Sequence, residues 1–310
     1  MSLVERLRSR RGPVFEFMSR RLPHTRALAT EANRALHGLL GGPALPRPPG
    51  ANAGAVGTAL ELWLRLRLAQ DRALTATAPF SASALDAAHG RCHPDHPGRG
   101  PVQDEVRDVD RRLRALTVPA RRRPPAWALR GLLLLAHMEH CARAARALLA
   151  LQPLAREAAA RGQPLAGLLI SPQDLRDLRA LIVMTGPWAR ELRRAHHIAA
   201  SASFDLSRDL GGADCDLVAD GRLAEVKTTT QACIVERMCL WQLAGYLLAD
   251  QSDRYAIRRL EVWAPRWGAR LAWPAEALLS RLSGEDAVSL PAWRAAFAAA
   301  VSVPAPGPAA

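Results

Sequence analysis

Hydrophobic residues recur at helical spacing through most of the first 200 residues of the chain. This spacing predicts helices over residues 2–40, 56–72, 104–114 and 126–161. Ser171, Pro172 and Asp174 form a helix-start signal. It predicts one helix to about residue 185 and another over residues 187–200. We therefore expect a large helical N-terminal region.

The pattern changes to strand-like alternation within residues 211–230. Asp220 and Gly221 form a strong two-residue hairpin signal, because both central residues of a type I′ turn need φ > 0. Counting outward from this turn places Asp216 opposite Glu225. The sequence therefore predicts a hairpin, with residues 228–230 finishing its second strand.

Side chains alternate between the two faces of a strand, so the hairpin has an apolar face and a charged one. The apolar face suits a core and carries Cys215, Leu217, Ala224 and Val226. The other face carries Asp214, Asp216, Glu225 and Lys227, with Asp214 opposite Lys227. Directly opposed carboxylates lie roughly 5 Å apart and repel. A fold tolerates them when a cation lies between them, and proteins commonly hold Mg²⁺ by one or two carboxylates plus substrate phosphates.

The elements expected after the hairpin are a helix, two strands and two further helices. The helix covers residues 231–250, and the strands cover 258–264 and 269–273 around a turn at 265–268. The last two helices are expected around residues 274–282 and 291–301.

Lys227 is the only lysine of the chain, and every other formally positive side chain is arginine. A compact ammonium can hold a water molecule or a developing phosphorane oxygen in a way that a planar guanidinium cannot. Its position beside two acids makes Lys227 the most informative single residue in the sequence.

Composition limits the class of protein. With 310 residues and 49% apolar residues, the chain can bury one large core or two ordinary ones. We expect a helical segment and Pro/Gly linker over residues 1–53, a mostly helical region over 54–195, a core domain over 196–302 and a disordered tail over 303–310.

No apolar stretch is long enough for a membrane span, and no signal peptide is recognisable. Five cysteines without paired spacing favour a reducing compartment, so we expect a cytoplasmic protein.

The net charge is +13 and the isoelectric point is about 11.1. Such a charge attracts polyanions, and nucleic acid is the simplest such partner.

The charged hairpin and the helix after it resemble a known family. Asp216 followed by Glu225-Val226-Lys227 is similar to the D…(D/E)xK signature of the PD-(D/E)xK phosphodiesterases. Gln242 and Tyr246 resemble the QxxxY motif of the RecB-like exonuclease branch. The resemblance implies an α/β fold with a restriction-endonuclease-like mixed sheet flanked by helices. It also implies a metal-dependent nuclease whose expected substrate is DNA.

The resemblance further implies roles for individual residues. Asp216 and Glu225 would hold Mg²⁺ or Mn²⁺, with the Val226 carbonyl as a third ligand. Lys227 would position or deprotonate the attacking water and stabilise the transition state. Gln242 and Tyr246 would orient the substrate.

Several residues are candidates for completing the metal site. Asp214 could share the metal or pair with Lys227. Glu61 stands on a predicted helix where the RecB-like family has a histidine, and it could be an extra metal ligand. Further candidates just upstream of the hairpin are Glu191, His196 and His197. The residue types of a zinc site also occur within eight residues at His89, Cys92, His93 and His96, but no second half of a zinc finger follows, so the sequence favours an exposed irregular loop there.

Two other functions remain open from the sequence. The chain could be a non-cleaving protein that binds nucleic acid or a protein partner and keeps a silent nuclease-like site. A metal-dependent hydrolase of a non-nucleic substrate is the third reading, which the basic charge disfavours.

Overall fold

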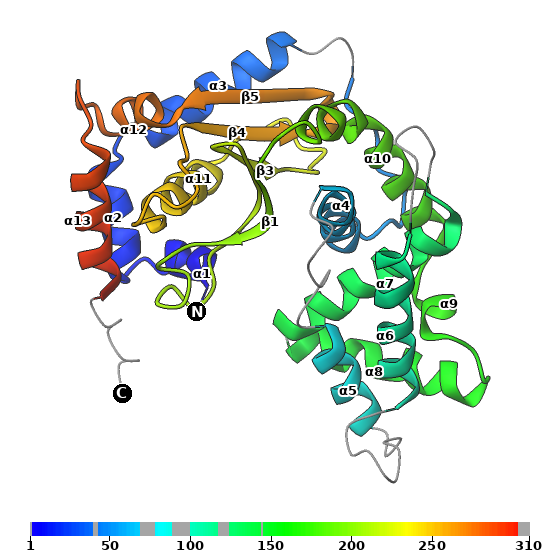
Figure 1. The fold of residues 1–310 in the computed structure, drawn as a ribbon. Helices are drawn as coiled ribbons and strands as arrows, with labels where there is room; N and C mark the ends of the chain where they lie inside the picture. Colours follow the sequence, from blue (N-terminus) through cyan, green and yellow to red (C-terminus); the bar gives the residue numbers. More distant parts are fainter. Residues whose placement is uncertain are drawn as a thin grey trace. The chain divides into compact units, whose positions relative to one another are not determined.

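The computed structural model describes residues 2–39, 43–68, 78–88, 100–116, 124–143 and 145–302. The chain forms two compact units (Figure 1). The sheet unit comprises Met1–Leu45 and Leu192–Ala310, and the helical unit comprises Pro46–Glu191. The protein is thus a mixed α/β protein, as expected. The expected tail over 303–310 lies outside the described residues.

The described part of the helical unit is built from helices alone. They are α4 (Ala53–Leu68), α5 (Ala78–Ala87), α6 (Pro101–Arg114), α7 (Ala126–Arg143), α8 (Ala145–Ala160), α9 (Leu165–Leu169) and α10 (Pro172–Leu192). The predicted start of α10 is confirmed, because the Asp174 N–H donates to the Ser171 hydroxyl at 3.1 Å. This unit confirms the expected large helical region.

The sheet unit contains a mixed five-stranded sheet. Its strands are β1 (Ile198–Ser203), β2 (Asp214–Ala219), β3 (Arg222–Val226), β4 (Arg259–Ala264) and β5 (Ala269–Pro274), in the spatial order β1-β2-β3-β4-β5. Only the β3–β4 pair is parallel. A parallel pair needs a crossover connection, and α11 (Arg237–Ala249) supplies it (Figure 1). The central strand, β3, therefore has a neighbour on each side.

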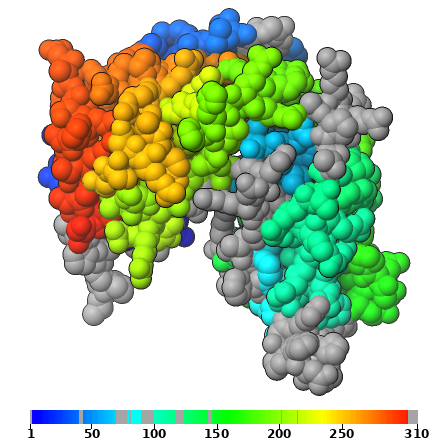
Figure 2. All heavy atoms as spheres, viewed as in Figure 1, coloured from blue at the N-terminus to red at the C-terminus, as the bar shows by residue number. Residues whose placement is uncertain are grey.

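Helices flank the sheet within the same unit. They are α1 (Leu3–Arg8), α2 (Pro13–Arg21), α3 (Thr25–Leu39), α12 (Ala275–Ser283) and α13 (Leu290–Ser302). Between β4 and β5 lies the short 3₁₀ helix η1 (Pro265–Trp267). In the space-filling view, α13 (red) forms part of the outer layer of this unit (Figure 2). No described helix is both long and apolar enough to cross a bilayer.

The core of the sheet unit surrounds α11, which is buried on nearly all sides. Gly245 of α11 lies so close to α1 that a Cβ there would meet the Leu3 side chain at 3.1 Å. Met18 of α2 belongs to the same core. The N-terminal helices thus pack with the sheet, which differs from the expected separate segment over residues 1–53. Local composition does not reveal such contacts, because they join residues more than 200 positions apart.

The predicted hairpin is confirmed. Asp220 and Gly221 have φ angles of 44° and 73°, and Leu217 pairs with Ala224. The ladder ends at that pair, before the predicted pairs Asp216–Glu225 and Asp214–Lys227. The strands β4 and β5 and the helices α12 and α13 also form near their predicted positions.

Three predictions of secondary structure are wrong. The helix expected over residues 187–200 ends as α10 at Leu192, and residues 198–203 form β1 instead. Ile198–Ser203 is mostly alanine and serine, so its strand conformation comes from pairing with β2 rather than from propensity. The expected helix over residues 231–250 begins only at Arg237, and residues 228–230 leave the strand.

Gly221→Ala should destabilise the fold by about 2–4 kcal/mol, because φ is positive there and a Cβ would lie 2.5 Å from the Ala256 carbonyl oxygen. Gly38 is exposed on α3, and no atom lies near the position of an added Cβ, so Gly38→Ala should raise the free energy of unfolding by up to about 1 kcal/mol. Urea unfolding of both variants tests the turn. Equal urea midpoints for Gly221→Ala and Gly38→Ala would contradict the requirement for glycine at this turn.

Candidate functional site

The candidate site lies where the central strand β3 ends. Glu225 and Val226 are its last residues, and Lys227 follows them directly. The Lys227 N–H donates to the Trp263 carbonyl of β4 at 2.8 Å, so the backbone at Lys227 is fixed by the parallel partner strand. The side chains of Glu225 and Lys227 are two residues apart and therefore share a face.

Lys227 and Glu225 form a close ion pair. The Lys227 Nζ atom donates to the Glu225 Oε1 atom at 2.8 Å. Glu225 is only 5% exposed, while the Lys227 side chain is 25% exposed. Glu225 Oε2 is buried and has no hydrogen-bond partner in the part of the chain that the structure describes. One oxygen of this carboxylate thus accepts a hydrogen bond from the ammonium, and the other is buried without a donor among the described residues.

Neighbouring carboxylates keep Lys227 charged. Burial alone would lower the pKa of Lys227, but the negative charges of Glu225 and Asp216 and the hydrogen bond that Lys227 donates to Glu225 raise it overall. The ammonium therefore keeps its proton at neutral pH. In the chain as it stands, Lys227 is a hydrogen-bond donor rather than a base.

Asp216 of β2 lies beside this pair. Its Oδ2 atom accepts the Val226 N–H at 2.7 Å. Hairpin pairing extends only to Leu217 and Ala224, so this side-chain contact continues the link between β2 and β3 beyond the ladder. The contact brings the two predicted metal-binding carboxylates to the same end of the hairpin.

Gln242 and Tyr246 of α11 follow in a chain of contacts. Lys227 Nζ donates to the Gln242 side-chain oxygen at 3.2 Å. The Gln242 amide nitrogen lies 3.5 Å from the Tyr246 hydroxyl. Tyr246 is 4% exposed and stacks on Phe204, with ring centroids 5.6 Å apart. Gln242 therefore contacts the ammonium directly, whereas Tyr246 acts on the site through Gln242.

The division of the hairpin into a core face and a polar face is too simple. Leu217 and Ala224 are buried as predicted. Val218 and Leu223, which share the face of the acids by alternation, also belong to the main core. Both faces are buried because helices pack against the sheet. The site consequently lies at the end of a strand whose two faces are buried.

His196 and His197 do not join this site. Their N–H groups donate to the Asp220 carboxylate at the hairpin turn, at 3.1 and 2.9 Å. Asp216 lies four residues along the strand from Asp220, roughly 13 Å away. The expectation that either histidine completes the metal site is wrong, because β1 runs antiparallel to β2 and begins at the opposite end.

The remaining candidates are placed as follows. Glu61 and Glu191 belong to the helical unit. Asp214 opens β2 and pairs with Ser203, while its side chain lies outside the described part of the structure. The four residues of the weaker zinc candidate, His89, Cys92, His93 and His96, also lie outside it.

The donor set at the site suits a hard cation. Among the described side chains, no group of three or more His, Cys, Asp and Glu residues gathers where it could hold a metal. Asp216 and the buried, unpartnered Glu225 oxygen are two carboxylate donors, which fit Mg²⁺ or Mn²⁺. Burial raises the pKa of the nearby Cys239 thiol to about 12, and sulfur is a softer ligand than Mg²⁺ or Mn²⁺ prefers.

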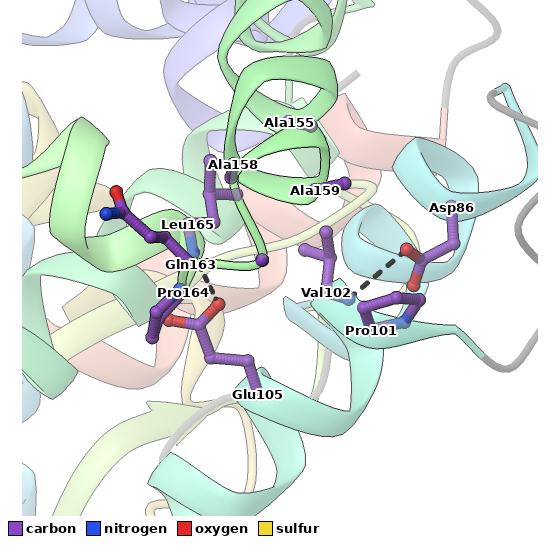
Figure 3. Close-up of a pocket in the computed structure, with 11 residues that line it drawn as sticks. Asp86, Pro101, Val102, Glu105, Ala155, Ala158, Ala159, Gln163, Pro164 and Leu165 are labelled. Carbon is purple, nitrogen blue, oxygen red and sulfur yellow. Dashed lines mark hydrogen bonds between the residues drawn. The ribbon is translucent and has the colours of Figure 1, made fainter.

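The helical unit contains a cavity of about 510 Å³ near α6, α8 and α9 (Figure 3). Two acids line it, and both already cap helices. Asp86 accepts the Gln103 N–H at 2.9 Å, and Glu105 accepts the Leu165 N–H at 2.8 Å. Burial raises the pKa of Glu105. The other lining residues are mostly small and apolar, so the cavity does not display the convergent polar groups of a catalytic site.

Sequence reasoning missed the residues that fix the loop after Lys227. Arg266 and Trp267 of η1 donate to the carbonyls of Thr228 and Thr229. Asn33 of α3 bonds to the backbone of Ile234 and Val235. No local pattern marks these residues, because each acts on a segment at least 38 positions away.

Comparisons of the chain with models of protein families, with curated proteins and with solved structures give no match.

Lys227→Met should lower the free energy of unfolding by about 2–3 kcal/mol at pH 7, because it leaves the Glu225 carboxylate buried without a counterion. The double variant Lys227→Met/Glu225→Gln should recover much of that loss, since it removes the unpaired charge. Urea unfolding measures both. If the double variant is no more stable than Lys227→Met, pairing with Lys227 does not stabilise the buried Glu225 carboxylate.

Proposed function

We propose that the chain is a metal-dependent nuclease that hydrolyses phosphodiester bonds, with DNA as the expected substrate. The observation that carries the proposal is the constellation at the end of β3. There, the only lysine of the chain contacts a buried carboxylate and a glutamine, with a second carboxylate alongside. In this proposal the five-stranded sheet is restriction-endonuclease-like.

The residues of the proposed metal site are Asp216, Glu225 and the Val226 carbonyl, with Asp214 in support. A bound Mg²⁺ or Mn²⁺ would lower the pKa of a water and neutralise charge on the scissile phosphate. The partly satisfied Glu225 carboxylate supports this assignment, because a buried oxygen without a donor is costly unless a ligand meets it.

Lys227 supplies the positive hydrogen-bond donor of the mechanism. Its contacts with Glu225 and Gln242 hold the ammonium in place, which suits positioning of the attacking water and stabilisation of charge on the phosphoryl oxygens. Gln242 holds the ammonium from the side of α11, which limits the directions in which its remaining hydrogens can point. Tyr246 supports Gln242 from the core.

The overall charge supports a polyanionic substrate. With +13 on 310 residues, the chain attracts phosphodiester backbones over long range, and a neutral substrate would gain nothing from this field.

A non-cleaving nucleic-acid- or partner-binding protein is the second candidate, and one observation favours it. The Lys227 ammonium already occupies one oxygen of Glu225, so a cation would have to share that carboxylate. Calorimetric Mn²⁺ binding without cleavage of single-stranded, duplex, branched or RNA substrates would identify this function.

The wild-type protein should cleave DNA in Mg²⁺ or Mn²⁺ and lose that activity in EDTA. Asp216→Asn, Glu225→Gln and Lys227→Ala should each lower the rate by at least about 100-fold while the proteins remain folded. Lys227→Arg should also lose most activity, because a planar guanidinium does not replace the compact ammonium. Gel-based cleavage of labelled oligonucleotides measures all of these rates.

Glu276→Gln is the matched control, because Glu276 is an exposed acid on α12 of the same unit. It should cleave at the wild-type rate. The proposed mechanism is wrong if purified Lys227→Ala cuts as fast as the control.

A further inference from the structure

The segment directly after Lys227 is an irregular but firmly held loop. Residues 228–233, the threonine loop, connect β3 to the segment before α11. Thr228 and Thr229 are partly buried, and the residues from Thr230 to Cys233 are exposed. The loop thus lies at the surface beside the candidate site.

Side chains from two distant elements hold the carbonyl groups of this loop. Arg266 Nε donates to the Thr228 oxygen at 2.6 Å, and Trp267 Nε1 donates to the Thr229 oxygen at 3.1 Å. His37 Nε2 lies 3.0 Å from the Ala232 oxygen, and a proton on Nε2 completes that bond. Three peptide groups of the loop are therefore fixed through their oxygens.

The N–H group on the opposite edge of each fixed peptide has no acceptor within the described structure. A trans peptide is planar and its C=O and N–H bonds point in opposite directions. The described chain contains no cis peptide bond. The N–H groups of Thr229, Thr230 and Cys233 therefore point away from Arg266, Trp267 and His37. None of these three N–H groups donates to another atom within the described structure.

The loop is also fixed at its far end. Asn33 Oδ1 accepts the N–H groups of both Ile234 and Val235 at 2.9 Å, and Asn33 Nδ2 donates to the Val235 oxygen at 2.9 Å. Arg266 is 2% exposed, so a buried cation stands behind the Thr228–Thr229 peptide and increases the polarity of its N–H. An anion that approaches the loop from solvent would meet N–H groups whose positions are already fixed, so its binding would cost little conformational entropy.

We propose that the threonine loop binds a phosphodiester group of the nucleic-acid substrate through the backbone N–H groups of Thr229 and Thr230. This inference rests on the proposed function and assigns the loop to a phosphate other than the scissile one. Thr230 is three residues from Lys227, so their Cα atoms lie within roughly 10 Å of each other. That distance suits a phosphate next to the scissile one on the same nucleic-acid strand. Successive free N–H groups form anion-binding concavities in other proteins.

Backbone amide NMR tests the contact directly. Protein labelled with ¹⁵N-threonine is titrated with a single-stranded DNA hexamer in EDTA, so that binding is seen without cleavage. The Thr229 and Thr230 amide signals should shift, while Thr30, an exposed threonine on α3, should not. Signals are assigned from Thr229→Ser and Thr230→Ser variants. Unchanged Thr229 and Thr230 signals at saturating DNA would overturn the proposal.

A paired substitution tests the role of the loop in affinity. Trp267→Phe keeps an aromatic side chain but removes the indole N–H that donates to the Thr229 oxygen, so the peptide is no longer fixed. We expect DNA affinity in EDTA to fall about threefold to tenfold. Trp293 lies on α13, and Trp293→Phe loses an indole donor to Glu285; this variant is the matched control and should bind like wild type. Equal affinity of the two variants counts against the proposal.

The two proposals fail in different ways. Shifts of the threonine amides without any metal-dependent cleavage would retain the phosphate-binding loop and reject the nuclease. Cleavage in Mg²⁺ without such shifts would retain the nuclease and reject the loop.

Discussion

The Glu225–Lys227 ion pair at the end of the central strand is the interaction on which the site depends. A carboxylate that is 5% exposed is costly unless a cation or several donors meet it. Here the ammonium meets one oxygen, and its own position is set by the ladder to β4 and by Gln242 of α11. The parallel strand and the crossover helix therefore have a chemical consequence: together they hold the only lysine of the chain against a buried acid.

The crossover helix in turn requires the N-terminal segment. An amphipathic helix can expose one side, but α11 is apolar nearly all round and needs cover on every side. Part of that cover comes from Leu3 and Met18 near the start of the chain. Asn33 and His37 of α3 hold the loop after Lys227 as well. Residues that look like a separate helical segment in the sequence are thus structural parts of the unit that carries the site.

The sequence predicts local features well and misses those set by tertiary contacts. The Asp220–Gly221 turn, β4, β5 and most helices follow from turn chemistry and periodicity. The strand β1 does not, because Ile198–Ser203 has little strand propensity and becomes a strand by pairing with β2. For the site, alternation predicted that Glu225 and Lys227 share a face. It could not predict that His196 and His197 lie at the wrong end, since that depends on the direction of an unpredicted strand.

The placement of charge around the site explains why backbone donors are suited to the loop. An arginine presented beside Asp216 and Glu225 would pair with these acids and lose its capacity for phosphate. Neutral N–H groups do not compete for the carboxylates in this way, and they still favour an anion when their peptides are fixed. Arg266 stands on the other side of the loop, where its Nε atom donates to the Thr228 carbonyl. In the proposed arrangement, the Lys227 ammonium pairs with the acids, the many arginines attract the polyanion over long range, and the loop contacts a phosphate locally.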